Sequence, residues 1–141
     1  MYTFASERLI AATPAAIFAA IQDPTRLARW WGPDGFSNQF EVCEFREGGS
    51  WIFTMHGPDG TVYPNQSQFR RIVADQQVVI RHLVQPHFEL TITLQPHAQG
   101  TLLQWQQVFD DENVANAIRH IVEPANEQNL NRLTAEVQAG G

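Results

Sequence analysis

The sequence contains no lysine, and all nine of its basic residues are arginine. Without a lysine amine the chain cannot form the Schiff base of lysine-dependent catalysis, anchor pyridoxal phosphate or supply the phosphate-binding lysine of a P-loop. Charged residues of either sign are scarce, at 17% against roughly 25% in typical soluble domains. We expect the fourteen glutamines to supply much of the polar surface instead.

Runs of basic residues and long apolar runs are also absent. The net charge is −6, so the chain lacks the positive footprint of proteins that bind nucleic acid or anionic lipid. No segment approaches the roughly 18 apolar residues of a membrane span, and MYTFASERLI has no basic region before an apolar run. We therefore expect neither nucleic acid nor membrane as a partner, and a cytoplasmic location.

Cysteine is represented once, by Cys43, which excludes an intramolecular disulfide and a cysteine pair for structural zinc. A reducing compartment fits this usage. The sequence has no G-x-S-x-G motif, and no two histidines show a metal-ligand spacing such as H-E-x-x-H. We therefore predict no metal, no cofactor and no catalytic residue. The histidines are His56, His82, His87, His97 and His120.

The length of 141 residues suits a single domain over 1–141. A strand is predicted over 2–10. Thr13-Pro14 and Asp23-Pro24 each combine a capping oxygen with proline at the first helical position, which predicts short helices over Pro14–Gln22 and Pro24–Trp31.

From Phe36 onward, short segments of period two alternate with turn dipeptides such as Gly48-Gly49 and Gln99-Gly100. Loops of hairpin length predict an antiparallel meander. One face of this sheet carries the apolar side chains, because Phe88, Leu90 and their neighbours alternate with polar residues. The predicted strands cover 37–46, 50–56, 61–74, 77–84, 87–96 and 101–109.

After Asp110-Asp111 the apolar period becomes helical and continues to the C-terminal glycines. Pro124 interrupts this helix and predicts a bend or break near 122–124, because proline removes one backbone hydrogen bond. A sheet with one dry face needs cover, and this helix alone is long enough. We therefore predict an α+β fold in which the sheet wraps the C-terminal helix.

Three motifs, RWWGPDGF, EFREGGSW and MHGPDG, stand in this order along the chain. In this respect the sequence resembles the family related to the activator of heat-shock protein 90 ATPase, within the START/SRPBCC (Bet v 1-like) helix-grip superfamily. The resemblance implies a seven-stranded sheet around the helix, with a cavity that in related families holds apolar small molecules. His82 and Asn126 depart from the aromatic residue and tryptophan usual at these positions, which makes the expected pocket more polar.

Trp30 and Trp31 cannot both face one core, because neighbouring helical side chains point about 100° apart. Either one fills the core while the other caps the cavity by packing, or Trp31 contacts a ligand directly. The bulky aromatic rings on the inward face of the sheet either leave a cavity or fill the space around the C-terminal helix. The polar side chains near these rings, Tyr63, His82, Gln107 and Asn126, either hydrogen-bond one another and nearby backbone or orient a ligand. The candidate ligand-binding residues are Trp31, Trp51, Phe53, Met55, Tyr63, Phe69, His82, Phe88, Trp105, Gln107, Ile121 and Asn126.

Three functions follow from these alternatives. The first is a small-molecule binding protein with an apolar or aromatic ligand between sheet and helix. The second is a protein-interaction module of the chaperone ATPase activator type, with an exposed patch that includes Trp30 and the 57–66 hairpin. The third is a cyclase- or hydrolase-like enzyme that uses the same cavity, with His82 as an acid–base group. A homodimer is compatible with the sequence.

Overall fold

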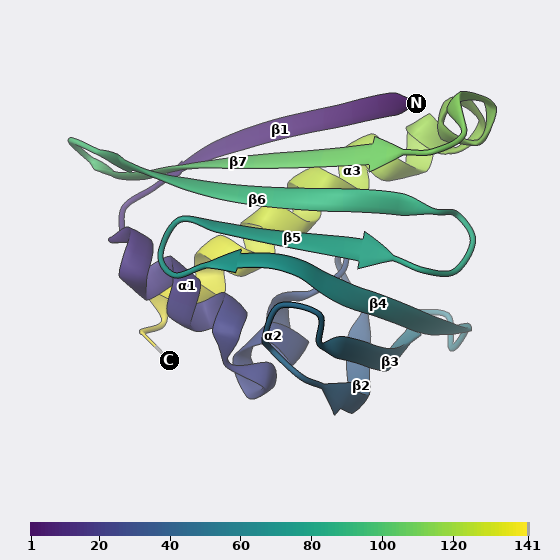
Figure 1. Cartoon of the computed structure of the whole chain (residues 1–141), viewed down its shortest axis with the longest axis horizontal. Helices are drawn as coiled ribbons and strands as arrows, with labels where there is room; N and C mark the ends of the chain where they lie inside the picture. The colour runs from purple at the N-terminus through teal and green to yellow at the C-terminus, as the bar shows by residue number, and fades with distance from the viewer. Residues whose placement is uncertain (141) are drawn as a thin grey trace.

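The computed structural model describes residues 1–140, which form one antiparallel sheet and three helices (Figure 1). The two short helices lie between the first and second strands, and the long helix ends the chain. The elements are β1 (Tyr2–Ile10), α1 (Pro14–Gln22), α2 (Pro24–Trp30), β2 (Ser37–Cys43), β3 (Ser50–His56), β4 (Val62–Val73), β5 (Gln77–His82), β6 (Phe88–His97), β7 (Gly100–Phe109) and α3 (Glu112–Gln138).

The sequence signals for the helix starts are confirmed atom by atom. The hydroxyl of Thr13 accepts from the backbone N–H of Ala16, and the carboxylate of Asp23 accepts from that of Thr25. Asp111 caps α3 in the same way, accepting from two backbone N–H groups. These caps satisfy donors that the first helical turn leaves free.

The seven strands follow the order β1-β7-β6-β5-β4-β3-β2, and all neighbours are antiparallel. Only β1 is out of sequence order, because it pairs with β7 at the far edge. Register shifts at Phe40/Val42 and Phe69/Arg71 interrupt two of the ladders. Such bulges increase local twist and bend a strand, which suits a sheet that curves around a helix.

Two of the predicted strands end earlier than expected. The strand predicted over 37–46 stops at Cys43, because Glu44 to Gly49 form a turn in which Gly49 N–H donates to the Arg46 carbonyl. The strand predicted over 77–84 stops at His82, after which Leu83 turns outward and is 38% exposed.

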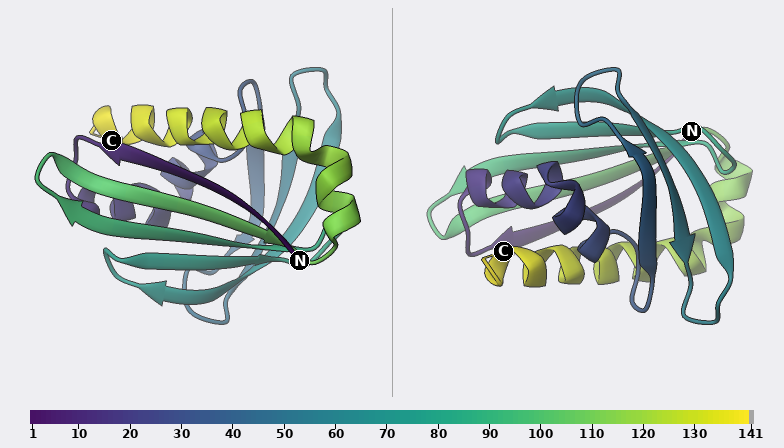
Figure 2. Two further views of the ribbon diagram at one scale, coloured as in Figure 1. Left: turned by 90° about the horizontal axis from the view of Figure 1, so that it is seen from above. Right: turned by 90° about the horizontal axis from the view of Figure 1, so that it is seen from below.

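The long helix α3 crosses the concave face of the sheet, as predicted. It is continuous across Pro124, but its axis bends between its first turns and the remainder (Figure 2). A bend is the expected effect of an internal proline, so the predicted bend is present and no break occurs. The first turns pack on Phe4 and Phe109, and the later turns pack on the main core.

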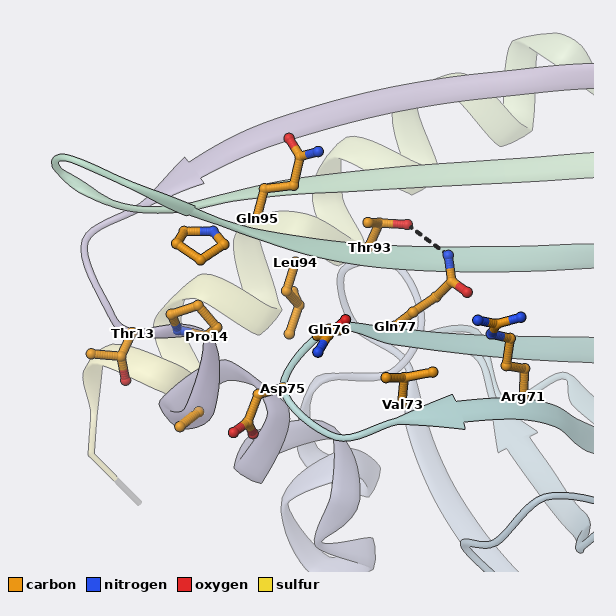
Figure 3. Close-up of a pocket in the computed structure, with 12 residues that line it drawn as sticks. Thr13, Pro14, Arg71, Val73, Asp75, Gln76, Gln77, Thr93, Leu94 and Gln95 are labelled. Atoms are coloured by element: carbon orange, nitrogen blue, oxygen red, sulfur yellow. Dashed lines mark hydrogen bonds between the residues drawn. The ribbon is translucent and has the colours of Figure 1, made fainter.

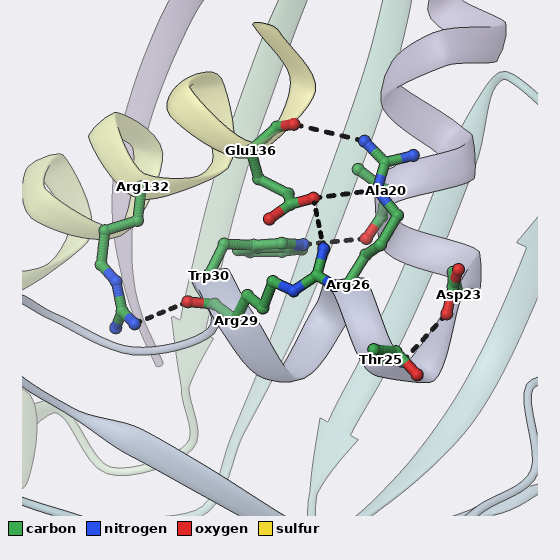
Figure 4. Close-up of polar contacts among 8 residues, drawn as sticks. All are labelled: Ala20, Asp23, Thr25, Arg26, Arg29, Trp30, Arg132 and Glu136. Atoms are coloured by element: carbon green, nitrogen blue, oxygen red, sulfur yellow. Dashed lines mark hydrogen bonds and ion pairs between the residues drawn. The ribbon is translucent and has the colours of Figure 1, made fainter. Parts of the chain in front are cut away.

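Helices α1 and α2 cover the sheet at the end where α3 finishes (Figure 2). Arg26 of α2 and Glu136 of α3 form a largely buried ion pair, with Nε 3.0 Å from Oε2 (Figure 4). Neither α1 nor α2 covers the opposite end of the concave face, where α3 is the only helix above the sheet within residues 1–140 (Figure 2). That difference decides where a cavity remains.

Candidate functional site

The two adjacent tryptophans occupy different environments. Trp30 is 1% exposed, and its indole N–H donates to the carbonyl oxygen of Ala20 at 2.9 Å (Figure 4). Trp31 is 9% exposed and its ring lies 4.9 Å from that of Trp51 and 6.1 Å from that of Trp105, centroid to centroid. Both rings nevertheless belong to one buried core cluster, so the expectation that they cannot face one core is wrong. The predicted helix over 24–31 ends at Trp30, and Trp31 has an extended backbone (φ −67°, ψ 130°) that turns its ring back beside that of Trp30 and toward the cavity.

A cavity of about 190 Å³ lies between the sheet and the middle of α3. Residues from β3 to β7, from α3 and from the segment after α2 surround it, and each is buried or half-buried. Among the described residues that line it, none carries a carboxylate or a guanidinium. The lining residues are Trp31, Pro33, Phe53, Met55, Asn65, His82, Phe88, Leu90, Trp105, Gln107, Ala125, Asn126 and Asn129.

The residues of α3 explain why the space stays open at this end. In its later turns the buried face carries Leu130, Leu133 and Val137, which fill the gap to the sheet. In the turns above the cavity the same face carries Ala125 and two asparagines instead. Asn129 is directed at the backbone of Trp30 and Gly32, Asn126 at Gln107, and Ala125 has only a methyl group, so none of the three fills the space.

The segment 31–36 closes one side of the cavity and is held by Arg132 of α3. The Arg132 guanidinium is half-buried and lies among backbone oxygens rather than beside a carboxylate. Burial lowers the pKa of Arg132, and the charge of Asp34 opposes that shift. The donor–acceptor distances of these contacts are 2.7 to 3.2 Å. The carbonyls that accept from Arg132 are those of Arg29, Trp31, Gly32, Pro33 and Phe36.

Asn129 fixes the same segment from the cavity side. Its Nδ2 donates to the Trp30 carbonyl at 2.9 Å, and its Oδ1 accepts from the Gly32 N–H at 3.2 Å. Gly32 has a φ of +99°, and a Cβ there would come within 2.8 Å of the Met55 side chain. Only glycine adopts this conformation readily, so the tight turn after Trp31 depends on it.

Two side-chain amides meet at the cavity wall between β7 and α3. Nδ2 of Asn126 donates to Oε1 of Gln107 at 3.0 Å. Asn126 is 8% exposed, and Gln107 is half-buried. The indole N–H of Trp105, on the same wall, has no hydrogen-bond partner among residues 1–140. The wall is thus apolar overall, with a few polar groups concentrated at one place.

His82 contributes a ring face rather than a free nitrogen. Its Nδ1 lies 2.9 Å from the carbonyl oxygen of Pro86, and its Nε2 lies 2.7 Å from Oδ1 of Asn65. The imidazole stacks on Phe88 with centroids 4.5 Å apart. Both nitrogens thus contact protein oxygens, and an acid–base role would require one of these contacts to open.

His82 makes stability depend on pH. Burial lowers the pKa of His82 from its ordinary value of 6.5, and hydrogen bonds with the Pro86 and Val84 backbone oppose this effect. The unfolded chain therefore takes up the proton first, so the free energy of unfolding is highest above about pH 6.5 and decreases as the pH falls toward the folded-state pKa. Urea unfolding at pH 5.5 and 7.5 measures this difference. We expect His82→Phe to reduce it, and an unchanged difference would contradict the assignment.

Eight of the twelve residues expected from the sequence line the cavity, and four lie elsewhere. Trp51 and Phe69 are fully buried and stack on each other, 5.5 Å apart, so these two rings fill the core instead. Tyr63 faces the same side as the cavity residues but beyond it, where it packs on Phe36 and is 44% exposed. Ile121 lies on the outer side of α3 and is 58% exposed.

Five lining residues were not expected from the sequence. Asn65 could have been found by counting back in twos from inward-facing Phe69, since a strand alternates its faces. Leu90 was assigned to the dry face but not to the site. The small residues of α3 and the loop proline carry no comparable signal. The unexpected residues are Pro33, Asn65, Leu90, Ala125 and Asn129.

A larger depression of about 710 Å³ lies at the end of the β4–β5 hairpin beside the start of α1 (Figure 3). Most of its lining residues are exposed, among them Arg71, Asp75 and Gln95. Its lining is mostly exposed, whereas every residue that lines the cavity under α3 is buried or half-buried and several of them are aromatic. We therefore take the cavity as the candidate site.

Metal binding and nucleophilic chemistry by a thiol have little support in the described part of the chain. Among residues 1–140, no group of three histidines, cysteines, aspartates or glutamates is placed to hold a metal ion. Cys43 is half-buried on the edge strand β2, and burial raises the pKa of its thiol to about 11. At neutral pH the thiol is protonated and a poor nucleophile.

A curved seven-stranded antiparallel sheet closed around a long C-terminal helix defines the helix-grip class of proteins. Within this class, the chain belongs to the family described as Activator of Hsp90 ATPase homolog 1-like protein, which matches residues 11–138. The resemblance in the sequence motifs is thereby confirmed. None of the proteins with curated descriptions matches the chain. No helix within residues 1–140 has both the length and the apolar character that crossing a membrane requires.

Several solved structures share the fold over nearly the whole chain. Protein NE0264 from Nitrosomonas europaea superposes with a TM-score of 0.88 at 17% identity, covering 99% of this chain and 96% of that one. A protein from Arthrobacter aurescens gives 0.88 at 24% identity, with coverage of 97% and 86%. The AHSA1 protein from Silicibacter pomeroyi gives 0.80 at 23% identity, with coverage of 99% and 100%. At these identities the likeness establishes the fold alone.

Proposed function

We propose that this protein binds an apolar or aromatic small molecule in the cavity between the sheet and α3. The observation that carries the proposal is a void of about 190 Å³ walled by aromatic rings and a few polar groups. Ligand sites in proteins share this combination of apolar walls and a small number of polar groups that orient the ligand. Protein interiors contain few spaces larger than a water molecule, so a space of this size between sheet and helix is informative.

Filling the cavity should abolish binding without unfolding the protein. Ala125 lines the cavity from α3, so Ala125→Phe places a ring in the space that a ligand would use. We expect binding of toluene or benzamide, measured by calorimetric titration, to weaken at least tenfold while the melting temperature stays the same or rises. Ala117→Phe is the matched control, because Ala117 is exposed on the same helix. Equal binding by wild type and Ala125→Phe would remove the cavity from the proposal.

A second candidate is a protein-interaction module, which the family description suggests. Val62 and Tyr63 at the start of β4 are 52% and 44% exposed and favour a contact surface there. Trp30, which the sequence analysis placed in such a patch, is buried and does not contribute. Stimulation of a chaperone ATPase by the wild type and not by Tyr63→Ser would support this candidate, and no stimulation by the wild type would dismiss it.

A further inference from the structure

We infer that the cavity selects an uncharged molecule of about one aromatic ring that carries a hydrogen-bond donor and an acceptor side by side, as a primary carboxamide does. The Gln107–Asn126 pair would recognise that group. This inference rests on the proposed function and names the chemistry of its ligand. It follows from the unused hydrogen-bonding groups of the pair, the size of the cavity and the absence of charge in its wall.

The amide pair is only half satisfied within the protein. Asn126 donates to Gln107, and this contact uses one amide N–H and one amide oxygen. Among residues 1–140, Nε2 of Gln107 and Oδ1 of Asn126 have no protein partner. If both amides were turned over, the pair would instead leave Oε1 of Gln107 and Nδ2 of Asn126 free. Either orientation therefore leaves one donor and one acceptor of the pair without a protein partner.

The two free amide atoms are not among the fully buried unpaired side-chain atoms of residues 1–140, which are Oδ1 of Asn38 and the indole nitrogens of Trp51 and Trp105. They therefore keep access to water or to a molecule in the cavity, although Asn126 as a whole is only 8% exposed. A ligand with one acceptor and one donor would satisfy both amides at once. Carboxamides, lactams and protonated carboxylic acids present this pattern, whereas ketones, ethers and hydrocarbons do not.

The volume limits the rest of the ligand. A cavity of about 150 Å³ in another protein holds a benzene molecule, so about 190 Å³ accommodates one ring with a small substituent. The walls next to the amide pair are the rings of Trp105 and Phe88. Aromatic rings pack favourably on such surfaces in tilted or offset arrangements, which favours an aromatic ring over a flexible aliphatic chain.

The lack of charged side chains among the described lining residues favours an uncharged carboxamide over a carboxylate or an ammonium ion of similar shape. Among the described lining residues no arginine or acidic side chain is present, and both nitrogens of His82 already contact protein oxygens. A carboxylate or ammonium ion entering this space would lose its hydration without gaining a counter-ion, which is costly. A carboxylate also cannot donate to the acceptor of the amide pair. Benzamide should therefore bind better than benzoate, although the two molecules have nearly the same shape.

The test compares benzamide, benzoate and toluene by calorimetric titration of the whole protein at pH 7.5. We expect benzamide to bind at least tenfold more tightly than either of the others. In the double variant Gln107→Leu/Asn126→Leu, which removes donor and acceptor together, benzamide should lose at least tenfold while toluene binds equally or better. Benzoate binding as tightly as benzamide, or benzamide binding unchanged in the double variant, would overturn the inference.

Gln107→Glu provides a second test that keeps the side-chain shape. The new carboxylate can accept but not donate, so benzamide should weaken while the cation benzamidine gains at least tenfold. No gain for benzamidine would count against recognition at this position. Equal binding of toluene and benzamide by the wild type would refute the amide preference and leave the cavity proposal intact. Failure of all ring compounds to bind would refute both.

Discussion

Replacing Arg132 by alanine is expected to lower the free energy of unfolding by about 3 kcal/mol and the melting temperature by about 10 °C. The substitution leaves the backbone oxygens around the guanidinium without donors at distances now between 2.7 and 3.2 Å. Each buried oxygen left unpaired costs roughly 1–3 kcal/mol, reduced where water can reach the opened loop. Urea unfolding followed by tryptophan fluorescence measures the change.

Two variants separate this effect from the loss of a charge. Arg132→Lys keeps the charge but not the planar fork of donors, so we expect it to recover less than half of the loss. Arg46→Ala removes an arginine that is 68% exposed and should change stability by less than about 0.5 kcal/mol. A loss below 1 kcal/mol for Arg132→Ala would show that segment 31–36 does not depend on the guanidinium.

Trp30→Ala is expected to cost about 3–5 kcal/mol, the range for deleting a large aromatic side chain from a core. The ring is 1% exposed and lies 5.7 Å from Trp31 and 6.4 Å from Trp105, centroid to centroid. Its indole N–H also supplies the hydrogen bond to Ala20 that joins α2 to α1. Thermal and urea unfolding should both show the loss.

Trp30→Phe is the matched control for the hydrogen bond. Phenylalanine keeps most of the apolar ring but has no N–H, so this variant should lose about 1–2 kcal/mol. Trp31→Phe, by contrast, changes a residue in the cavity wall and should alter ligand binding more than stability. Equal effects of the Trp30 and Trp31 substitutions on binding would contradict the separate roles of the two rings.

The fold could be predicted from the sequence because its signals are local and repeated. Thr13 and Asp23, each followed by proline, identify the two short helices, and the alternation around Leu90 identifies a sheet with one dry face. The apolar face of the long C-terminal helix then has one place to pack. The bend at Pro124 follows from the chemistry of proline alone.

The extent of the cavity could not be predicted in the same way. Trp51 and Phe53 are two residues apart on β3 and therefore point to the same face, yet of the two only Phe53 lines the cavity. Alternation tells which side of the sheet a residue occupies but not which part of the helical layer lies above it. That layer depends on how α1, α2 and α3 divide the concave face, which is set by contacts between distant segments.

Arg132 and Asn129 illustrate the second limit. Their contacts with segment 29–36 join residues 96 to 103 positions apart, and no periodicity in the sequence encodes such pairs. An arginine next to the apolar stripe of a helix is usually a solvated charge. The available hint was the short loop Gly-Pro-Asp-Gly, in which the Phe36 N–H reaches the carbonyl of Pro33 and further carbonyls are left for donors from elsewhere.

A crystal structure of the protein grown with saturating benzamide is the most direct test of ligand binding in the cavity. The account predicts the benzamide ring between Phe88, Trp105 and α3, with its carboxamide within hydrogen-bond distance of both Gln107 and Asn126. A structure with side chains closing the cavity, or with benzamide bound only at the surface, would contradict it.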